Sequence, residues 1–203
     1  MRIAFLCAAL LTLSGCGSYN YRPPAMGQGG VNAKVIQKPV EEVWTAAIPA
    51  LGKAFYVINN MDKGSGLINV SYSGKPENFV DCGHITSSVQ NAMGKRDYSF
   101  PGASAYQEYE VMLSGELYAY QRKMELEGRI NLVFEALGKN ETRVTANTRY
   151  VVTKTILVRN MRGQTRSDKD SIPFNSGEGA QFPGQTECRA TGALEKRVLD
   201  MIQ

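Results

Sequence analysis

The single histidine of the chain, His84, lies close to a cysteine in the stretch Asp81-Cys82-Gly83-His84. A thiolate and an imidazole act together as nucleophile and base when their side chains lie within hydrogen-bonding distance. Proximity in sequence does not by itself provide that geometry, and a zinc site would need further His or Cys ligands. The sequence contains no CxxC, HExxH, GxSxG, GxGxxG or P-loop motif. We therefore expect no catalytic residue, no metal site, no cofactor and no enzymatic activity.

Carboxylates spaced two residues apart are a second candidate for chemistry. The pairs are Glu108 and Glu110, Glu125 and Glu127, and Asp168 and Asp170. This spacing places both members of a pair on one face of a strand. Glycoside hydrolysis needs two carboxylates that flank a sugar, and nothing in the sequence indicates a lined cleft. The solvent-facing side of a strand explains these pairs better.

The N-terminal stretch carries another kind of thiol chemistry. Arg2 precedes a run of apolar and small residues from Ile3 to Leu13, and Leu13-Ser14-Gly15 leads into Cys16. Such a run is too short to span a bilayer as a helix, which needs about 20 residues. The stretch resembles a bacterial lipoprotein signal peptide with Leu13-Ser14-Gly15-Cys16 as its lipobox. The resemblance implies removal of residues 1–15, lipidation of the Cys16 sulfur, and acyl chains such as palmitate on the new N-terminus.

The other cysteines then follow by elimination. Cys7 leaves with the signal peptide and Cys16 carries lipid, so Cys82 and Cys188 remain. Two thiols in an exported chain are typical of one disulfide bond. This disulfide would close a loop of roughly a hundred residues, and chain-entropy estimates give ~4–5 kcal/mol of stabilisation for such a loop. We expect this disulfide, with Cα atoms within about 7 Å; the alternative is a reactive thiol beside His84.

Residues 16–31 are rich in Gly, Pro and Tyr and show no apolar periodicity, so a flexible, lipidated tether is predicted there. By the sorting rule of lipoproteins in enteric-type bacteria, Gly17 after the lipidated cysteine implies the outer membrane, with a periplasm-facing anchor. Inner-membrane retention and surface exposure stay open. No second apolar run is long enough to span a membrane. The formal net charge of +4 does not suggest a nucleic-acid-binding protein.

Residues 32–203 are predicted to form a single α+β domain. A strand over 33–36 precedes a helix that begins at Pro39, whose apolar residues recur at spacings of three, four and seven. Pro49 is expected to kink or end this helix. Strands over 55–61 and 67–73 are expected to flank a turn-rich loop.

Three further strands are predicted from period-two alternation over 111–120, 124–135 and 143–152, with continuation over 153–161. The segment 74–105 has weak periodicity. The polar stretch 163–189 is predicted to be a long loop. An apolar stripe over 191–202 predicts a closing helix.

These elements predict a single antiparallel sheet packed on the C-terminal helix, with one N-terminal helix. The order resembles the helix-grip architecture and, among lipoproteins, the BamC (NlpB/DapX) type of domain. The residues that carry the resemblance are the lipobox, the helix start Pro39-Val40-Glu41-Glu42-Val43-Trp44, and the predicted hairpin over 55–73 with Gly66-Leu67-Ile68. It covers residues 31–75 and the order of the elements. BamC-type domains belong to the outer-membrane β-barrel assembly machine.

Two groups of side chains are candidates for a partner surface. Aromatic residues gather around 98–120, and basic residues lead into the predicted loop. The candidate partner surface consists of Tyr98, Phe100, Tyr106, Tyr109, Arg159, Arg162 and Arg166. The aromatic residues would line a groove for a peptide, glycan or acyl chain, or would complete a core. The basic residues would meet phosphates or carboxylates of the envelope, or form a solvated face.

Two functions follow from these expectations. The first is a non-enzymatic envelope lipoprotein, an accessory or scaffold subunit of an outer-membrane-associated assembly with an envelope protein as partner. The second is a carrier or sensor of an apolar ligand held between the sheet and the C-terminal helix. The sequence does not indicate the oligomeric state.

Overall fold

The computed structural model describes residues 16–25, 30–54, 56–184 and 186–203. The signal peptide predicted over 1–15 lies outside these residues. The helices are α1 (Val40–Lys53) and α2 (Ala193–Met201), with a short 3-10 turn at Pro76–Asn78. The strands are β1 (Cys16–Arg22), β2 (Ala33–Ile36), β3 (Val57–Asp62), β4 (Leu67–Gly74), β5 (Val80–Asp81), β6 (His84–Asn91), β7 (Gly94–Pro101), β8 (Tyr106–Leu113), β9 (Glu116–Gly138), β10 (Glu141–Asn160), β11 (Thr165–Asn175), β12 (Gly179–Gln181) and β13 (Glu187–Ala190).

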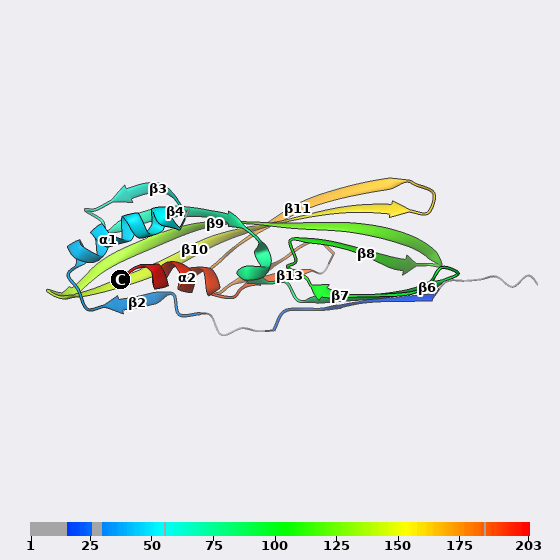
Figure 1. Ribbon diagram of the computed structural model, residues 1–203, viewed down its shortest axis with the longest axis horizontal. Coiled ribbons are helices and arrows are strands. Elements are labelled where there is room, and N and C mark those ends of the chain that lie inside the picture. The colour runs from blue at the N-terminus through cyan, green and yellow to red at the C-terminus, as the bar shows by residue number, and fades with distance from the viewer. Residues whose placement is uncertain (1–15, 26–29, 55, 185) are drawn as a thin grey trace, which may run out of the picture.

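The long hairpin of β9 and β10 organises the molecule. The two strands pair antiparallel over their whole length, from the turn after Gly138 to the pair Tyr118–Asn160. Figure 1 shows that this hairpin runs from one end of an elongated molecule to the other. Even-numbered residues of both strands point to one face, which is buried along most of its length. We call this the inner face of the hairpin.

Different strands flank the hairpin at its two ends. Near the β9–β10 turn, β4 pairs with β9 and β2 pairs with β10. Toward the other end, β8 pairs with β9 and β11 pairs with β10. We call the end with β2, β3, β4, α1 and α2 the helical half, and the end with β1, β6, β7 and β8 the distal half (Figure 1).

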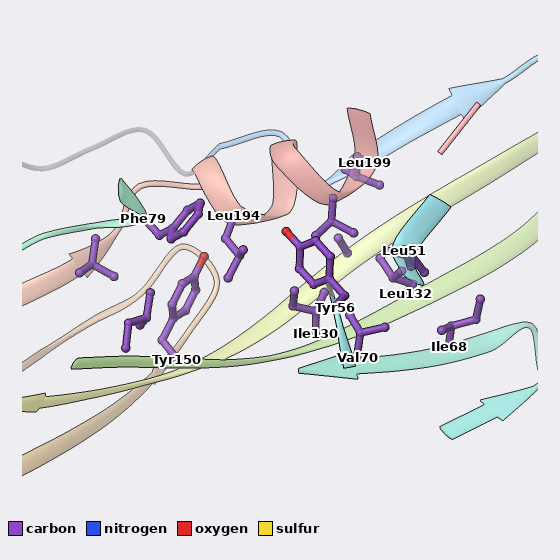
Figure 2. Packing of buried hydrophobic residues seen from close by; sticks show 14 of the residues in the cluster. Leu51, Tyr56, Ile68, Val70, Phe79, Ile130, Leu132, Tyr150, Leu194 and Leu199 are labelled. Carbon is purple, nitrogen blue, oxygen red and sulfur yellow. The ribbon is translucent and has the colours of Figure 1, made fainter. Parts of the chain in front are cut away.

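The helical half has a dense apolar core. Trp44 of α1 packs edge-on against Phe134 of β9, with ring centroids 5.2 Å apart. Side chains from both helices meet those of the sheet in Figure 2, among them Leu51, Ile68, Val70, Ile130, Leu132, Leu194 and Leu199. Each such side chain contributes roughly 1.5–3 kcal/mol on burial. The core between sheet and helices is therefore filled by side chains, and a hollow of about 570 Å³ lies beside it between β2 and α2.

The predicted N-terminal helix is confirmed. Glu41 and Glu42 lie in its first turn, where carboxylates interact favourably with the helix dipole. The inner stripe predicted from spacing is buried at Val43, Trp44, Ala47 and Leu51. Pro49 does not end the helix, which continues to Lys53. Pro49 is exposed, and the lost backbone donor falls in the last turn and a half.

The closing helix is shorter than its predicted span and is fastened by a polar contact. Glu195 of α2 is fully buried and accepts hydrogen bonds from the Tyr150 hydroxyl at 2.7 and 2.8 Å and from Ser176 Oγ at 2.6 Å. A buried carboxylate needs such donors to offset its desolvation. The contact joins α2 to β10 and to the chain directly after β11.

The mixed α and β content is as predicted, but the single sheet is not. The strands form three sheets: seven strands around the hairpin, β1-β6-β7, and β12-β13-β5. The weakly periodic segment 74–105 supplies β5, β6 and β7. The apolar periodicity of this segment is weak because β7 is mostly exposed and carries charged residues in a small three-stranded sheet. The nine residues of α2 also fall short of the long central helix of a helix-grip domain.

The strand predicted over 111–120 is instead a tight hairpin turn with a strand on each side. Ser114 and Gly115 have φ angles of 51° and 79°, the pattern of a two-residue hairpin turn with both central residues at positive φ. Leu113 therefore faces Glu116 across the turn. The turn inverts the phase of the alternation, so Tyr118 and Tyr120 share the inner face with Val111 and Tyr109.

Two segments predicted to be irregular contain strands. Residues 16–22 of the predicted tether form β1, which pairs along its whole length with β6. The predicted loop 163–189 contains β11, β12 and β13. β11 is an edge strand, and edge strands carry charged residues that prevent further pairing. The charges of β11 hid the strand pattern, and pairing with the adjacent strand β10 stabilises it.

Candidate functional site

The candidate site is a cavity of about 300 Å³ in the distal half. It lies where the inner face of the long hairpin meets β1, β6 and β8. Apolar side chains and tyrosines form most of the wall, and two cations, Arg122 and Lys154, reach it from neighbouring strands. The lining residues are Tyr19, Ile85, Tyr109, Val111, Leu113, Tyr120, Arg122, Lys154, Ile156, Pro183, Gly184 and Thr186.

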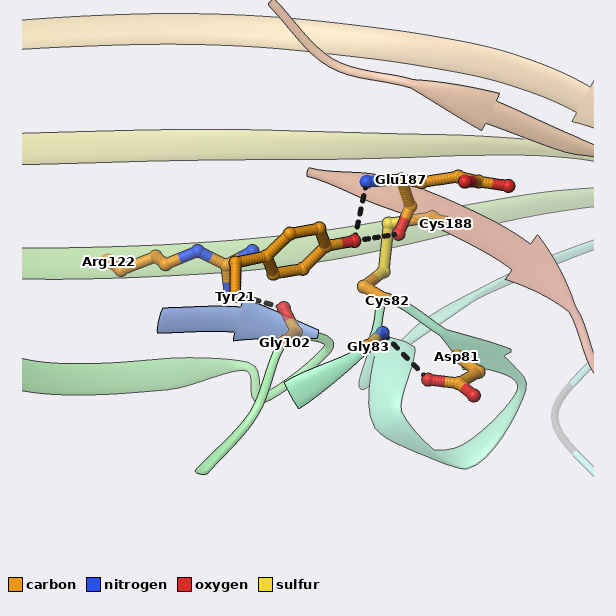
Figure 3. The surroundings of a disulfide bond; sticks show 8 residues. All are labelled: Tyr21, Asp81, Cys82, Gly83, Gly102, Arg122, Glu187 and Cys188. Atoms are coloured by element: carbon orange, nitrogen blue, oxygen red, sulfur yellow. Dashed lines mark hydrogen bonds between the residues drawn. A yellow bond between two sulfur atoms is a disulfide. The ribbon is translucent and has the colours of Figure 1, made fainter. Parts of the chain in front are cut away.

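Arg122 is the largest polar side chain in the interior, with 1% of its surface exposed. Its Nη1 donates a hydrogen bond to the Gly102 carbonyl oxygen, as Figure 3 shows. Its Nη2 is buried and has no hydrogen-bond partner among the described residues. Burial lowers the pKa of the guanidinium, but an arginine stays protonated at physiological pH. Arg122 therefore lines the cavity while one of its donor groups is buried without a partner in the described part of the structure.

Lys154 is the second buried cation, with 5% of its surface exposed. Its ammonium donates to the Pro183 carbonyl oxygen at 3.3 Å and lies 4.5 Å from the centre of the Phe182 ring. Burial, followed by the Arg122 charge, lowers the pKa of Lys154, while Asp170 and Asp168 oppose this shift. Neither aspartate forms an ion pair with it in the described part of the chain.

Strand register brings the two cations together. Arg122 pairs with Ile156 and Met124 with Lys154 across the β9–β10 ladder. Arg122 and Lys154 are thus diagonal neighbours on one face, a relation that separates side chains by about 7–8 Å at their base. Both side chains line the same cavity from there.

Tyrosines surround this cationic pair. Tyr109 stacks on Tyr120 with ring centroids 5.1 Å apart and also contacts Phe100. Burial raises the pKa of Tyr109 and of Tyr120. These phenols are therefore neutral at physiological pH and do not neutralise Arg122.

The cavity continues into a wider groove that leads outward. A hollow of about 500 Å³ shares Leu113, Tyr120 and Ile156 with the cavity and extends along Tyr118 and Val158 to the β10–β11 turn. A polar hollow of about 400 Å³ lies on the side of Lys154 and includes Asp168 and Asp170. The site thus has an apolar exit and a charged exit.

The predicted partner surface is not one surface. Phe100 and Tyr109 are buried in the distal apolar cluster, and Tyr98 is partly buried with its hydroxyl donating to Glu110 at 3.2 Å. Tyr106 is exposed, and its hydroxyl donates to Glu108. The three arginines lie apart on the β10–β11 hairpin; Arg162 contacts Glu116 and Arg166 contacts Asp168.

The cysteines lie as the elimination predicted. Cys82 and Cys188 are buried and at disulfide-bonding distance, with Cα atoms 4.0 Å apart, inside the expected limit. Beside them, the Tyr21 hydroxyl accepts a hydrogen bond from the Glu187 N–H and donates one to its carbonyl oxygen (Figure 3). Tyr21 therefore fixes the end of β1 to this linkage. Cys16 is exposed and unbonded.

Asp168 and Asp170 border the site at its charged exit, and the other groups considered for chemistry lie apart from the cavity lining. His84 Nε2 lies 2.9 Å from Ser99 Oγ, and Asp81 accepts a hydrogen bond from the Gly83 N–H. Glu125 pairs with Lys123 on the exposed face of β9. In the described ranges, no cluster of three or more His, Cys, Asp and Glu side chains could hold a metal ion. No described helix has the length and apolar character needed to cross a membrane.

The alternation contained a signal for the cations that sequence analysis missed. Arg122 is in phase with Met124 and Leu126, and Lys154 is in phase with Tyr150 and Val152. A charged residue in the buried phase of a strand is unusual unless it has a partner or a function. The missed turn at Ser114-Gly115 hid the matching phase of Tyr118 and Tyr120.

Comparison of the chain with protein-family models, curated proteins and solved structures found no match.

Proposed function

We propose that this protein is a non-enzymatic envelope lipoprotein, anchored to the outer membrane through Cys16, and an accessory or scaffold subunit of a membrane-associated assembly. The observation that carries the proposal is the position of Cys16, exposed at the outer end of β1 and paired with Gln90 of β6. A lipid on this residue holds the distal half at the bilayer and directs the helical half away from it.

The end of the distal half supports this orientation. Three turns lie at the same end as Cys16: those between β6 and β7, β8 and β9, and β10 and β11 (Figure 1). Each carries an exposed apolar side chain, namely Met93 (72% exposed), Leu113 (47%) and Met161 (67%). Apolar side chains next to basic residues such as Arg159 and Arg162 suit the interface of an anionic bilayer.

The helical half offers a surface for a protein partner. β3 is an edge strand, and its Val57 and Met61 side chains are exposed. An exposed edge permits addition of a strand from another chain. Two helices on one face of an antiparallel sheet also support the resemblance to the BamC type of domain, although α2 is short.

Two measurements test this proposal. Cys16→Ser should abolish fatty-acid labelling and release the protein from membranes or leave an uncleaved precursor. Undiminished label on the variant would exclude Cys16 as the site. A photo-crosslinker at Val57 should capture an envelope protein in intact cells, whereas one at Ser171, on the exposed face of β11, should not. If neither position captures an envelope protein above background, the scaffold role is wrong.

The distal cavity favours a second candidate function, a carrier or sensor of an apolar ligand. Between the sheet and the helices, where such a ligand was expected, Trp44, Phe134 and their neighbours fill the core, and a hollow of about 570 Å³ lies between β2 and α2. The cavity between the hairpin and β1, β6 and β8 is lined by apolar and tyrosine side chains and has the size of small-ligand sites. Native mass spectrometry of the mature chain should detect a co-purified small molecule, and a consistently empty protein would count against this function.

A further inference from the structure

In the described part of the chain, Arg122 and Lys154 are buried cations without an ion pair; Asp170, which faces Lys154 across the β10–β11 ladder, and Asp168 act on Lys154 without forming one. Every Asp and Glu of the chain belongs to the described residues, and in that part of the structure neither cation forms an ion pair. Arg96, in the same half, shows the contrast, because its Nε lies 2.5 Å from Glu110 Oε2. Buried charges are normally paired in this way, since desolvation of a lone ion is costly.

The two charges also repel one another. They are diagonal neighbours on one face, and the cavity they line screens them less than bulk water does. The Nη2 group of Arg122 is buried without a partner at this wall. An anion placed between them would supply the missing hydrogen-bond acceptor and the missing charge together.

We infer that the distal cavity binds a single-chain amphiphile whose anionic head, a carboxylate or a phosphate, lies between Arg122 and Lys154. The proposal rests on the carrier function and deepens it by assigning the chemistry of the ligand. The apolar chain of the ligand follows Leu113, Ile156 and Val158 along the groove toward the turns of the distal half.

The shape of the site favours this class over other anions. The wall is mostly apolar, and the groove that continues from it offers a path for a chain that needs to leave water. The charged exit is lined by Asp168 and Asp170 together with Arg166 and Lys169, so it offers no apolar path for a chain. The groove opens beside the turns at the Cys16 end, where the proposed anchor places the bilayer that contains such amphiphiles (Figure 1).

Calorimetric titration of the mature chain, residues 16–203 with Cys16→Ser, tests the inference without detergent. The probes are decanoate, decyl phosphate and decanol, which share a chain and differ in the head. We expect at least one anion to bind ten-fold or more tightly than decanol, and the comparison of the two anions distinguishes a fatty acid from a phosphate lipid. Equal binding of all three would overturn the anionic site but keep the carrier function. Binding of none would overturn both, and would leave the scaffold role untouched.

Matched variants locate the head. Lys154→Met should weaken binding of the preferred anion at least ten-fold and leave decanol binding unchanged. Lys123→Met is the control, because Lys123 lies on the opposite, exposed face of β9 and pairs with Glu125. Arg122→Lys keeps the positive charge but loses the guanidinium group. It should weaken binding of the preferred anion without unfolding the protein, as checked by circular dichroism. Equal effects of Lys154→Met and Lys123→Met would contradict the assignment.

Discussion

The two halves of the molecule share one hairpin and use its inner face differently. In the helical half, the inner positions carry Ile130, Leu132 and Phe134, and helices cover them. In the distal half the same phase carries Tyr118, Tyr120 and Arg122, covered by a small sheet that leaves a cavity. The core of one half is filled by its own side chains, with a hollow of about 570 Å³ beside it between β2 and α2. The core of the other half retains charge and space.

This difference separates stability from binding. Close apolar packing contributes most of the folding free energy of a domain. Buried charge and empty volume both reduce that free energy, so a half that keeps them depends on the other for its stability. We therefore expect variants in the helical half to change the free energy of unfolding and variants in the distal half to change binding.

The largest expected effect comes from cutting the link between the halves. Cys82 precedes β6 of the distal half, and Cys188 lies in β13, directly before α2. Replacing both by Ala should lower the free energy of unfolding by about 4–5 kcal/mol, the chain-entropy estimate for a loop near one hundred residues. Urea unfolding measures this loss, with Cys16→Ser as the control. An unchanged midpoint, or free-thiol labelling of both residues in unfolded, unreduced protein, would show that no bridge forms.

A matched pair of isoleucines compares the packing of the two halves. Ile130 lies in the helical core, and Ile85 borders the distal cavity; both are buried. Ile130→Ala should cost about 2–5 kcal/mol, the range for truncation in a dense core. Ile85→Ala should cost less, because part of its surface already faces empty space. Chemical denaturation of both variants gives the comparison, and equal losses would mean that the distal cavity closes in solution.

Alkaline pH should destabilise the helical half through a buried phenol. Burial raises the pKa of Tyr56 to about 12, and its hydroxyl has no hydrogen-bond partner among the described residues. The folded state holds this proton more tightly than the unfolded state does. The contribution of Tyr56 to the free energy of unfolding is therefore complete below pH 10 and is lost as pH rises toward 12. The loss is about 2–3 kcal/mol at 1.36 kcal/mol per pKa unit.

Tyr56→Phe tests that explanation. The variant should be as stable as the wild type near pH 7, since the hydroxyl makes no hydrogen bond there. Its stability should fall less between pH 10 and 12, as measured by urea unfolding at fixed pH. Parallel curves for the two proteins would show that Tyr56 ionises without unfolding the helical half.

The elements that sequence analysis predicted correctly are those with local signals. The spacing of Val43, Trp44 and Ala47 marked α1, and the alternation over 124–135 and 143–152 marked the inner parts of β9 and β10. β1 and β11 have no such signal, because pairing with β6 and β10 forms them rather than any alternation of their own. The partner of β1 is far along the chain and cannot be deduced from one sequence, whereas β11 is the second arm of a hairpin whose charged residues conceal its alternation.

The site was missed for a related reason. The disulfide followed from counting cysteines, whereas the cationic pair depends on strand phase. A single strand over 111–120 places Tyr118 and Tyr120 on the face opposite Val111, whereas the hairpin puts them on the same face as Val111 and Tyr109, in phase with Arg122. Two residues, Ser114 and Gly115, decide that phase through their positive φ angles.

The smallest expected change in the free energy of unfolding gives the sharpest comparison of the two halves, because the variant is expected to be more stable than the wild type. Lys154 has no carboxylate ion pair within the described chain, so replacing it with Met exchanges a poorly compensated buried charge for an apolar side chain of similar length. Such exchanges are often neutral or stabilising. We expect Lys154→Met to raise the free energy of unfolding by about 1 kcal/mol, less the lost contacts with Pro183 and Phe182. The control Lys123→Met, on the exposed face, should change the free energy of unfolding by no more than about 0.5 kcal/mol.

A gain in stability of Lys154→Met together with loss of anion binding would show that the distal half keeps this charge for its ligand. A loss in stability would mean that Lys154 belongs to the structural core, like the side chains of the helical half.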